Sequence, residues 1–97
     1  MADNEFALRK AMERATQAQT ALENPAIIAA FKSIEENCID GWRNSQPRDS
    51  EGRELLYQRM QALEGVRQQL ETAVANGQLS ALQIERDFQE PKRFGIV

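Results

Sequence analysis

The chain has 97 residues, of which 41% are hydrophobic and 28% charged, with a formal net charge of −3. A chain of this length is expected to form one domain with a modest core, which leaves little room for a deep catalytic cleft. The composition is typical of a globular protein, and the longest apolar run, residues 26–31, is far too short to cross a bilayer, so we expect neither wholesale disorder nor a membrane protein.

Several residue types bear on function through their number or position. The chain has no histidine, which removes the commonest general base and the commonest metal ligand, and we expect no cofactor. Its single cysteine, Cys38, fits a reducing compartment. The acidic start, residues 1–5, lacks the order of a secretory signal, so a cytosolic protein is expected. Basic residues are spread along the chain, which disfavours nucleic-acid binding.

Residues 4–23 are predicted to form a first helix. The positions Leu8, Met12, Ala15, Ala18 or Gln19, and Leu22 recur at steps of three and four, which places them on one helical stripe. Small residues occupy the middle of that stripe, so this helix contributes modest burial and needs a neighbour.

A second helix is predicted over residues 25–43. Asn24 is a favourable N-cap, and proline at the first helical position loses no hydrogen bond. Large apolar residues again recur at steps of three and four, while charged residues occupy the opposite face. The apolar positions are Ile27, Ile28, Phe31, Ile34, Cys38, Ile39 and Trp42.

A polar loop with Pro47 follows, after which Asp49 or Ser50 is able to cap a third helix over residues 51–76. The pair Asn76-Gly77 is a typical helix end, because glycine accepts the left-handed conformation there. Residues from Ser80 onward then have the spacing of a capping box for a short final helix.

These elements predict an all-α fold. Its centre is an antiparallel helical hairpin (about residues 25–43 and 51–76), in which Ile34 and Leu63 are expected to be buried, with an N-terminal helix and a short C-terminal helix added. Residues 1–90 are predicted to form a single helical domain and residues 91–97 a flexible C-terminal tail. The third helix is longer than the second, so its uncovered end needs the first helix or a second chain.

Trp42 and the tail supply the candidate contacts with another protein. A solitary tryptophan at a helix end is either a binding anchor or a cap on the hairpin core. The tail residues Phe94, Ile96 and Val97 are suited to dock on a partner, with packing on the chain's own hairpin as the alternative. For self-association the candidates are Leu63, Leu70 and Val74 on the third helix.

Three further groups of side chains resemble functional sites, but a structural or solvent-exposed role is favoured for each. Four arginines near the loop are able to clamp a phosphate, yet interleaved acidic residues favour a solvated, locally paired face. Cys38 lies on an apolar stripe, where a thiol behaves as a small hydrophobe. Carboxylates on the second helix, without histidine, favour a solvated face over a metal site. The arginines are Arg43, Arg48, Arg53 and Arg59, and the carboxylates are Glu35, Glu36 and Asp40.

The order of these segments resembles small helical proteins of tailed bacteriophages and prophages, many of them encoded in the virion-assembly region. The segments that carry the resemblance are Leu22-Glu23-Asn24-Pro25, Gly41-Trp42-Arg43, the run Asp49 to Glu54, and Asn76-Gly77-Gln78-Leu79. The resemblance implies a phage protein of the bacterial host cytoplasm, with possible association with the virion. It carries over no functional residue.

The leading hypothesis is a noncatalytic phage protein that binds another protein, encoded by the phage, and forms a homo-oligomer without contacting a membrane, as a virion-assembly or head-morphogenesis accessory. One alternative is a DNA-packaging protein like a terminase small subunit, with Arg9, Lys10 and Arg14 touching phosphate. Another is a phage inhibitor of a host enzyme or defence system. An enzyme is the least favoured class, since no glycine-rich phosphate loop is present.

Overall fold

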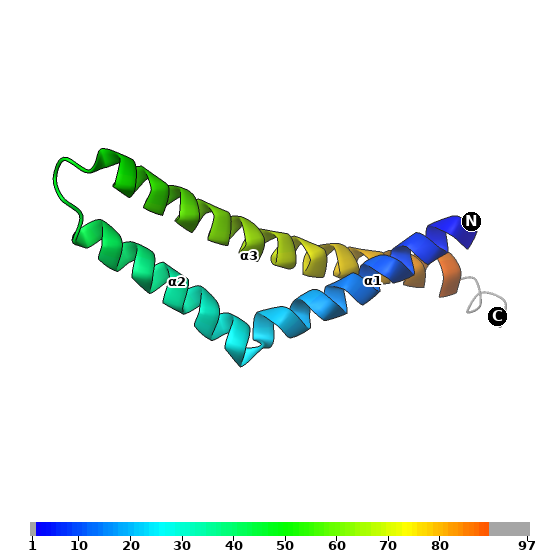
Figure 1. Cartoon of the computed structure of the whole chain (residues 1–97). Coiled ribbons are helices and arrows are strands. Elements are labelled where there is room, and N and C mark those ends of the chain that lie inside the picture. The colour runs from blue at the N-terminus through cyan, green and yellow to red at the C-terminus, as the bar shows by residue number, and fades with distance from the viewer. Residues whose placement is uncertain (1, 90–97) are drawn as a thin grey trace. The chain divides into compact units, whose positions relative to one another are not determined.

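A computed structural model describes residues 2–89, and these residues contain helices and no strand. The helices are α1 (Ala2–Glu23), α2 (Pro25–Arg43) and α3 (Ser50–Ile84), followed by a π-helical turn, η1 (Glu85–Gln89) (Figure 1). The predicted all-α class, with an N-terminal helix and one long helix, is confirmed.

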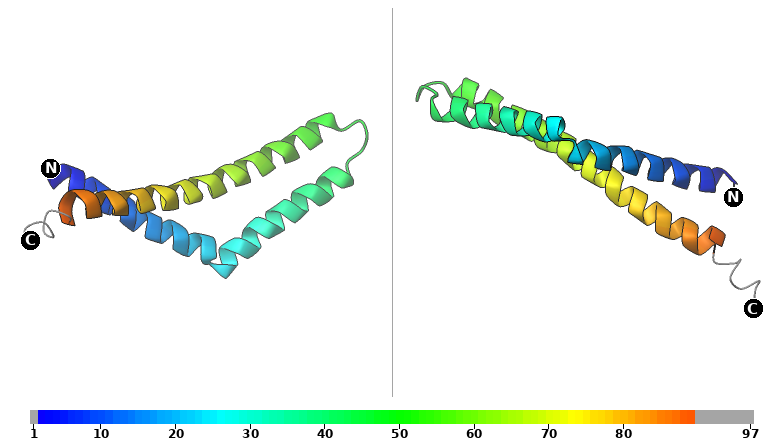
Figure 2. Two further views of the ribbon diagram at one scale, coloured as in Figure 1. Left: turned by 180° about the vertical axis from the view of Figure 1, so that it is seen from behind. Right: turned by 90° about the horizontal axis from the view of Figure 1, so that it is seen from below.

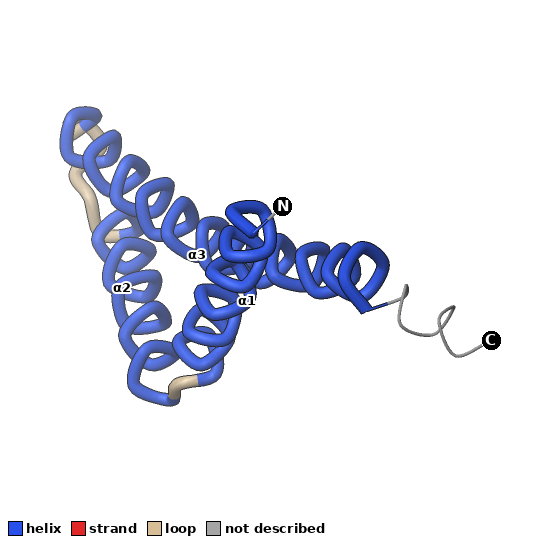
Figure 3. Tube along the Cα trace, turned by 90° about the vertical axis from the view of Figure 1, so that its right-hand side faces the viewer, coloured by secondary structure: helices blue, strands red, loops and turns tan. Residues whose placement is uncertain are grey.

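The junction between α1 and α2 is a single residue, Asn24 (Figure 3). Its backbone is extended, and its side-chain Oδ1 accepts hydrogen bonds from the N–H groups of Ala26 (2.8 Å) and Ile27 (3.3 Å). Pro25 occupies the first helical position, where no N–H donor is needed. The predicted cap and start of α2 are therefore confirmed.

The loop between α2 and α3 covers residues 44–49. Of the two predicted caps, Asp49 is the one used, because its Oδ1 accepts a hydrogen bond from the N–H of Gly52 at 2.9 Å. That bond satisfies one of the donors left open at the start of a helix.

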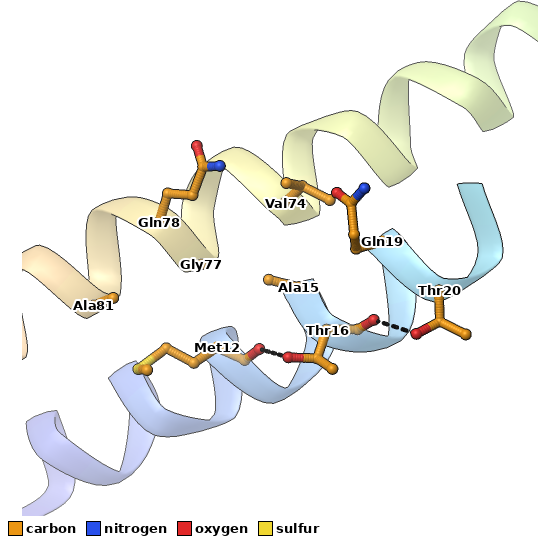
Figure 4. A pocket seen from close by; sticks show the side chains of 9 residues that line it. All are labelled: Met12, Ala15, Thr16, Gln19, Thr20, Val74, Gly77, Gln78 and Ala81. Atoms are coloured by element: carbon orange, nitrogen blue, oxygen red, sulfur yellow. Dashed lines mark hydrogen bonds between the residues drawn. The ribbon is translucent and has the colours of Figure 1, made fainter. Parts of the chain in front are cut away.

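The predicted end of the third helix at Asn76-Gly77 is wrong, and so is the separate short C-terminal helix. α3 continues through both residues to Ile84, and no described glycine has positive φ. Gly77 is instead a point of close approach to α1, since a Cβ placed on it would overlap the Cβ of Ala15 and lie 3.3 Å from the carbonyl oxygen of Ala11. Figure 4 shows Ala15 directed toward α3 at Gly77. Glycine here permits packing between helices and does not end one.

The chain divides into two compact units, residues 22–69 and residues 1–21 with 70–97. Both units share the single helix α3, and the prediction of one domain over residues 1–90 stays a prediction. The predicted tail, residues 91–97, lies outside the described residues.

In the unit of residues 22–69, α2 contacts the first part of α3, beside which it lies in the ribbon views (Figure 2). Cys38 of α2 and Leu63 of α3 are buried. A Cβ on Gly41 would lie 3.1 Å from Cδ1 of Leu56, so this glycine also marks a tight contact. The expectation for Leu63 is confirmed, whereas Ile34 is 42% exposed, and its predicted burial is wrong. Ile34 lies at the edge of the contact because the least exposed stripe of α2 runs through Phe31, Glu35 and Cys38.

In the other unit, α1 packs on the C-terminal part of α3 through small side chains. Ala18 of α1 and Ser80 and Ile84 of α3 are buried. The thin middle of the predicted α1 stripe is thus explained: small residues allow the two backbones to come close.

Candidate interaction surface

Large apolar side chains remain exposed on all three helices. Where such side chains gather on the surface of a small protein, they form an apolar patch that a binding partner is able to cover. The exposed members in the described chain are Phe6, Ile27, Ile28, Ile34, Ile39, Trp42, Leu55, Tyr57, Val66, Leu79 and Leu82.

Trp42 belongs to an apolar depression on α2 and α3. Its indole is 58% exposed, which excludes the interpretation as a buried cap on the hairpin core. The depression has a volume of about 180 Å³, and we call it the Trp42 depression. It is lined by Cys38, Ile39, Trp42, Leu56, Tyr57 and Met60. An aromatic rim around a floor of aliphatic and sulfur atoms suits an apolar side chain from another molecule.

The backbone at Trp42 is held by the loop that follows it. The carbonyl oxygen of Trp42 accepts hydrogen bonds from the N–H of Ser45 at 3.2 Å and from its hydroxyl at 2.7 Å. The guanidinium of Arg53 donates to the Ser45 hydroxyl (3.4 Å) and to the carbonyl oxygens of Gln46 (2.7 Å) and Pro47 (3.2 Å). Arg53 therefore orders the loop that fixes Trp42, a role that the sequence prediction of a solvated arginine face missed.

A second depression, of about 280 Å³, lies around Phe31 on the same unit, and we call it the Phe31 depression. It is lined by Leu22, Ile27, Ile28, Phe31, Lys32, Glu35 and Arg67. Its floor is apolar and its edge is charged, so it suits an apolar side chain whose neighbours are polar.

An ion-pair bridge separates the two depressions. Arg67 of α3 contacts Glu35 of α2 at 2.7 Å and Glu64 at 2.9 Å, and its guanidinium lies 5.4 Å from the centre of the Phe31 ring. These groups are about one-third to one-half exposed, so solvent screens the pairs. A charged residue at a position of helix contact favours one register over its neighbours. We call this group the Arg67 bridge.

The two depressions face the same way along α2. Ile28 lines the Phe31 depression and Ile39 lines the Trp42 depression. Eleven residues make about three turns of a helix and rise about 16 Å, so both side chains project from one face. The Trp42 depression, the Arg67 bridge and the Phe31 depression therefore form a linear track, which we call the α2 groove.

A second apolar face lies on α3 in the same unit. Leu55 and Val66 are more than half exposed, and Arg59 and Ala62 stand exposed between them at steps of four, three and four. That spacing places the four residues on one stripe, which we call the Leu55 face. Leu55 and Tyr57 are two residues apart and therefore project about 200° apart around α3, so the Leu55 face and the α2 groove are different surfaces.

The unit of α1 and the end of α3 contains a shallower hollow of about 530 Å³, shown in Figure 4. The hydroxyls of Thr16 and Thr20, which line it, donate to the carbonyl oxygens of Met12 (3.2 Å) and Thr16 (2.9 Å). Because these hydroxyls already bond to the helix backbone, the hollow offers little directional recognition.

The residues predicted for self-association are used within the chain. Leu63 is buried, and Leu70 and Val74 are partly buried. Exposed large apolar side chains lie instead on the Leu55 face and along the α2 groove. The predicted tail contacts, Phe94, Ile96 and Val97, lie outside the described residues.

The basic residues named for nucleic-acid contact lie on α1. Arg9 pairs with Glu5 at 3.1 Å, and Lys10 lies 3.9 Å from Glu13. Both cations have an acidic neighbour one turn away, which lowers the local positive potential, while Arg14 is exposed. Among the described residues no group of three metal-ligating side chains occurs, the carboxylates of α2 included.

No family model, no curated protein and no solved structure matches this chain. Within residues 2–89, no helix has the length and apolar character that a membrane crossing requires.

Proposed function

We propose that this chain is a noncatalytic protein–protein interaction module that presents an α2–α3 hairpin to other proteins and self-associates. The observation that carries the proposal is the α2 groove, an apolar track with an exposed tryptophan at one end and an ion-pair bridge at its centre. Exposed aromatic anchors beside apolar pockets are the typical energetic centres of protein interfaces.

Two contacts support the hairpin itself. Glu35 of α2 pairs with Arg67 of α3, and Gly41, farther along α2, lies against Leu56, farther back along α3. Residue numbers rise on one helix while they fall on the other, which is the order of antiparallel neighbours.

The resemblance to small phage proteins supports a setting for this function. We propose that the protein acts in the cytoplasm of a phage-infected bacterium as a virion-assembly or head-morphogenesis accessory, with a phage-encoded protein as its partner. An accessory of this kind needs surface for contacts and no reaction centre.

Site-specific photocrosslinking during infection tests the proposal. A benzophenone amino acid is placed at Trp42 and, in a matched control, at Asn37, an exposed residue that projects about 200° away from Ile39 around α2. We expect a discrete adduct from position 42, containing either a second copy or a phage structural protein, and a weaker one from position 37. An adduct with a host enzyme would favour the inhibitor alternative, and the absence of any adduct at position 42 would overturn the proposal.

A further inference from the structure

We propose that the Leu55 face of one copy docks in the α2 groove of a second copy, so that the chain assembles head to tail. This inference rests on the proposed interaction function and names the partner of the groove. Two observations carry it, the equal spacing of the anchor residues on the two surfaces and the opposite charges of Arg59 and Glu35.

The spacing of the two surfaces is the same. On α2, Glu35 is four residues from Ile39, and Ile28 is eleven residues from it. The Leu55 face repeats these steps in the opposite direction, because Arg59 follows Leu55 by four residues and Val66 by eleven. Each eleven-residue span rises about 16 Å.

This spacing fixes the register of the contact. When α3 of the docking copy lies antiparallel to α2 of the receiving copy, Leu55 reaches the Trp42 depression and Val66 reaches the Phe31 depression. Arg59 then meets Glu35 at the Arg67 bridge. An amphipathic helix is held in a groove by apolar anchors on one face, and residues eleven apart share a face because they are about three turns apart.

The charges agree with this register. The bridge carries two carboxylates, Glu35 and Glu64, for one guanidinium, and the ion pairs found within the described residues leave out Arg59. The match of Arg59 with Glu35 favours this alignment over neighbouring ones by electrostatic complementarity.

No charge conflict arises at the second depression. Lys32, which lines it, falls opposite Ala62 of the Leu55 face. The small side chain leaves the lysine solvated, so the contact there is apolar at Val66 and neutral beside it.

The contact is heterologous, because the two surfaces lie on different faces of the same helix pair. A copy that docks its Leu55 face keeps its own α2 groove open for the next copy. Interfaces of this kind repeat until they close into a ring or continue as a filament.

A mixing experiment tests the inference on the full chain. The docking variant carries Leu55→Asp with Val66→Asp, and the groove variant carries Ile28→Asp with Ile39→Asp. All four side chains are exposed, and circular dichroism checks that the variants keep their helices. The control carries Leu79→Asp with Leu82→Asp, which are exposed leucines of the other unit. Sedimentation velocity gives the assembly state, and emission from Trp42, the sole tryptophan, reports occupancy of the groove.

We expect the wild type and the control to assemble as concentration rises, with a blue shift of Trp42 emission, and each variant alone to stay monomeric. An equimolar mixture of the two variants should form a dimer and nothing larger, since one intact docking face meets one intact groove. A mixture that stays monomeric, a single variant that assembles like the wild type, or a wild type that never assembles overturns the inference.

A charge reversal tests the register. Arg59→Glu should weaken assembly by about twofold to fivefold, whereas Arg59→Lys, which keeps the positive charge, should retain most of it. Equal assembly of the Glu and Lys variants contradicts the alignment. Failure of this proposal differs from failure of the proposed function, because a phage protein crosslinked at Trp42 would retain the function while assigning the groove to another occupant.

Discussion

The two helix contacts described differ in how closely the backbones approach. Where α1 meets the end of α3, Ala15 faces Gly77, and the contact depends on the absence of side-chain atoms. Where α2 meets the start of α3, Leu63 and Cys38 are buried beside an ion pair between Glu35 and Arg67. The first contact is sensitive to any added volume. The second is built from large side chains, and the gaps between them form the two depressions of the α2 groove.

Truncating the large buried side chains should have the greatest effect on stability. Leu63→Ala in one unit and Ile84→Ala in the other should each lower the free energy of unfolding by about 2–4 kcal/mol, measured by urea denaturation. The control is Leu79→Ala, whose side chain is 65% exposed and whose loss should cost less than about 0.5 kcal/mol. Because Trp42 reports only on the unit of residues 22–69, a fluorescence midpoint that differs from the circular dichroism midpoint would show that the units unfold separately.

A methyl group added at Gly77 tests whether the close approach of α1 and α3 depends on this glycine. Gly77→Ala should destabilise the protein by about 1–2 kcal/mol, because the clash with Ala15 outweighs the gain in helix propensity. Gly65→Ala is the matched control on the same helix: nothing lies within 4 Å of its added Cβ, so it should stabilise by about 0.5–1 kcal/mol. Equal thermal shifts for the two variants would show that close approach is not what Gly77 provides.

The caps come next in expected size. Asn24→Ala and Asp49→Ala each remove a side-chain acceptor from the start of a helix and should cost about 1 kcal/mol of unfolding free energy. Ser50→Ala, which alters a residue next to the cap used, is the control and should change stability much less. A larger loss at Ser50 than at Asp49 would show that the cap had been assigned to the wrong residue.

The smallest effect is expected for the bridge. A double-mutant cycle with Glu35→Gln and Arg67→Met should give a coupling energy of about 0.2–1 kcal/mol that shrinks as salt is added, since the pair is partly exposed. The exposed Lys10 and Glu13 pair is the comparison and should show coupling near zero. A coupling at the bridge that is insensitive to salt would contradict the role assigned to solvent.

Local signals in the sequence were sufficient for most helix boundaries. Asn24-Pro25 and Asp49 act within one turn of the chain, so their residue types determine the caps whatever the helices pack against. Asn76-Gly77 is an equally clear local signal for a helix end, yet α3 continues through both residues. The difference is Ala15, which lies far away in sequence and whose contact with Gly77 no local pattern reveals.

The candidate surface was predictable only in part. Trp42 was identified from its type and its place at a helix end, but its exposure depends on the loop that Arg53 holds through Gln46 and Pro47. The burial of Leu63 was expected correctly, yet helical periodicity alone does not say whether an apolar stripe packs on its own chain or on a second one. The Leu55 face was not predicted, because Leu55 lies beside the main apolar stripe of α3 and two of the four residues of the face, Arg59 and Ala62, are not large apolar residues.

The burial of Cys38 allows the local stability of the α2–α3 contact to be measured by thiol labelling. The thiol is the only one in the chain, and it is 4% exposed at the lining of the Trp42 depression, so a maleimide or disulfide reagent should react much faster when α2 and α3 separate locally than when they are in contact. Under conditions where closing outpaces modification, the labelling rate measures the free energy of that opening. The rate of labelling at this one sulfur atom would thus measure the local separation of α2 from α3, independently of the contact between α1 and α3.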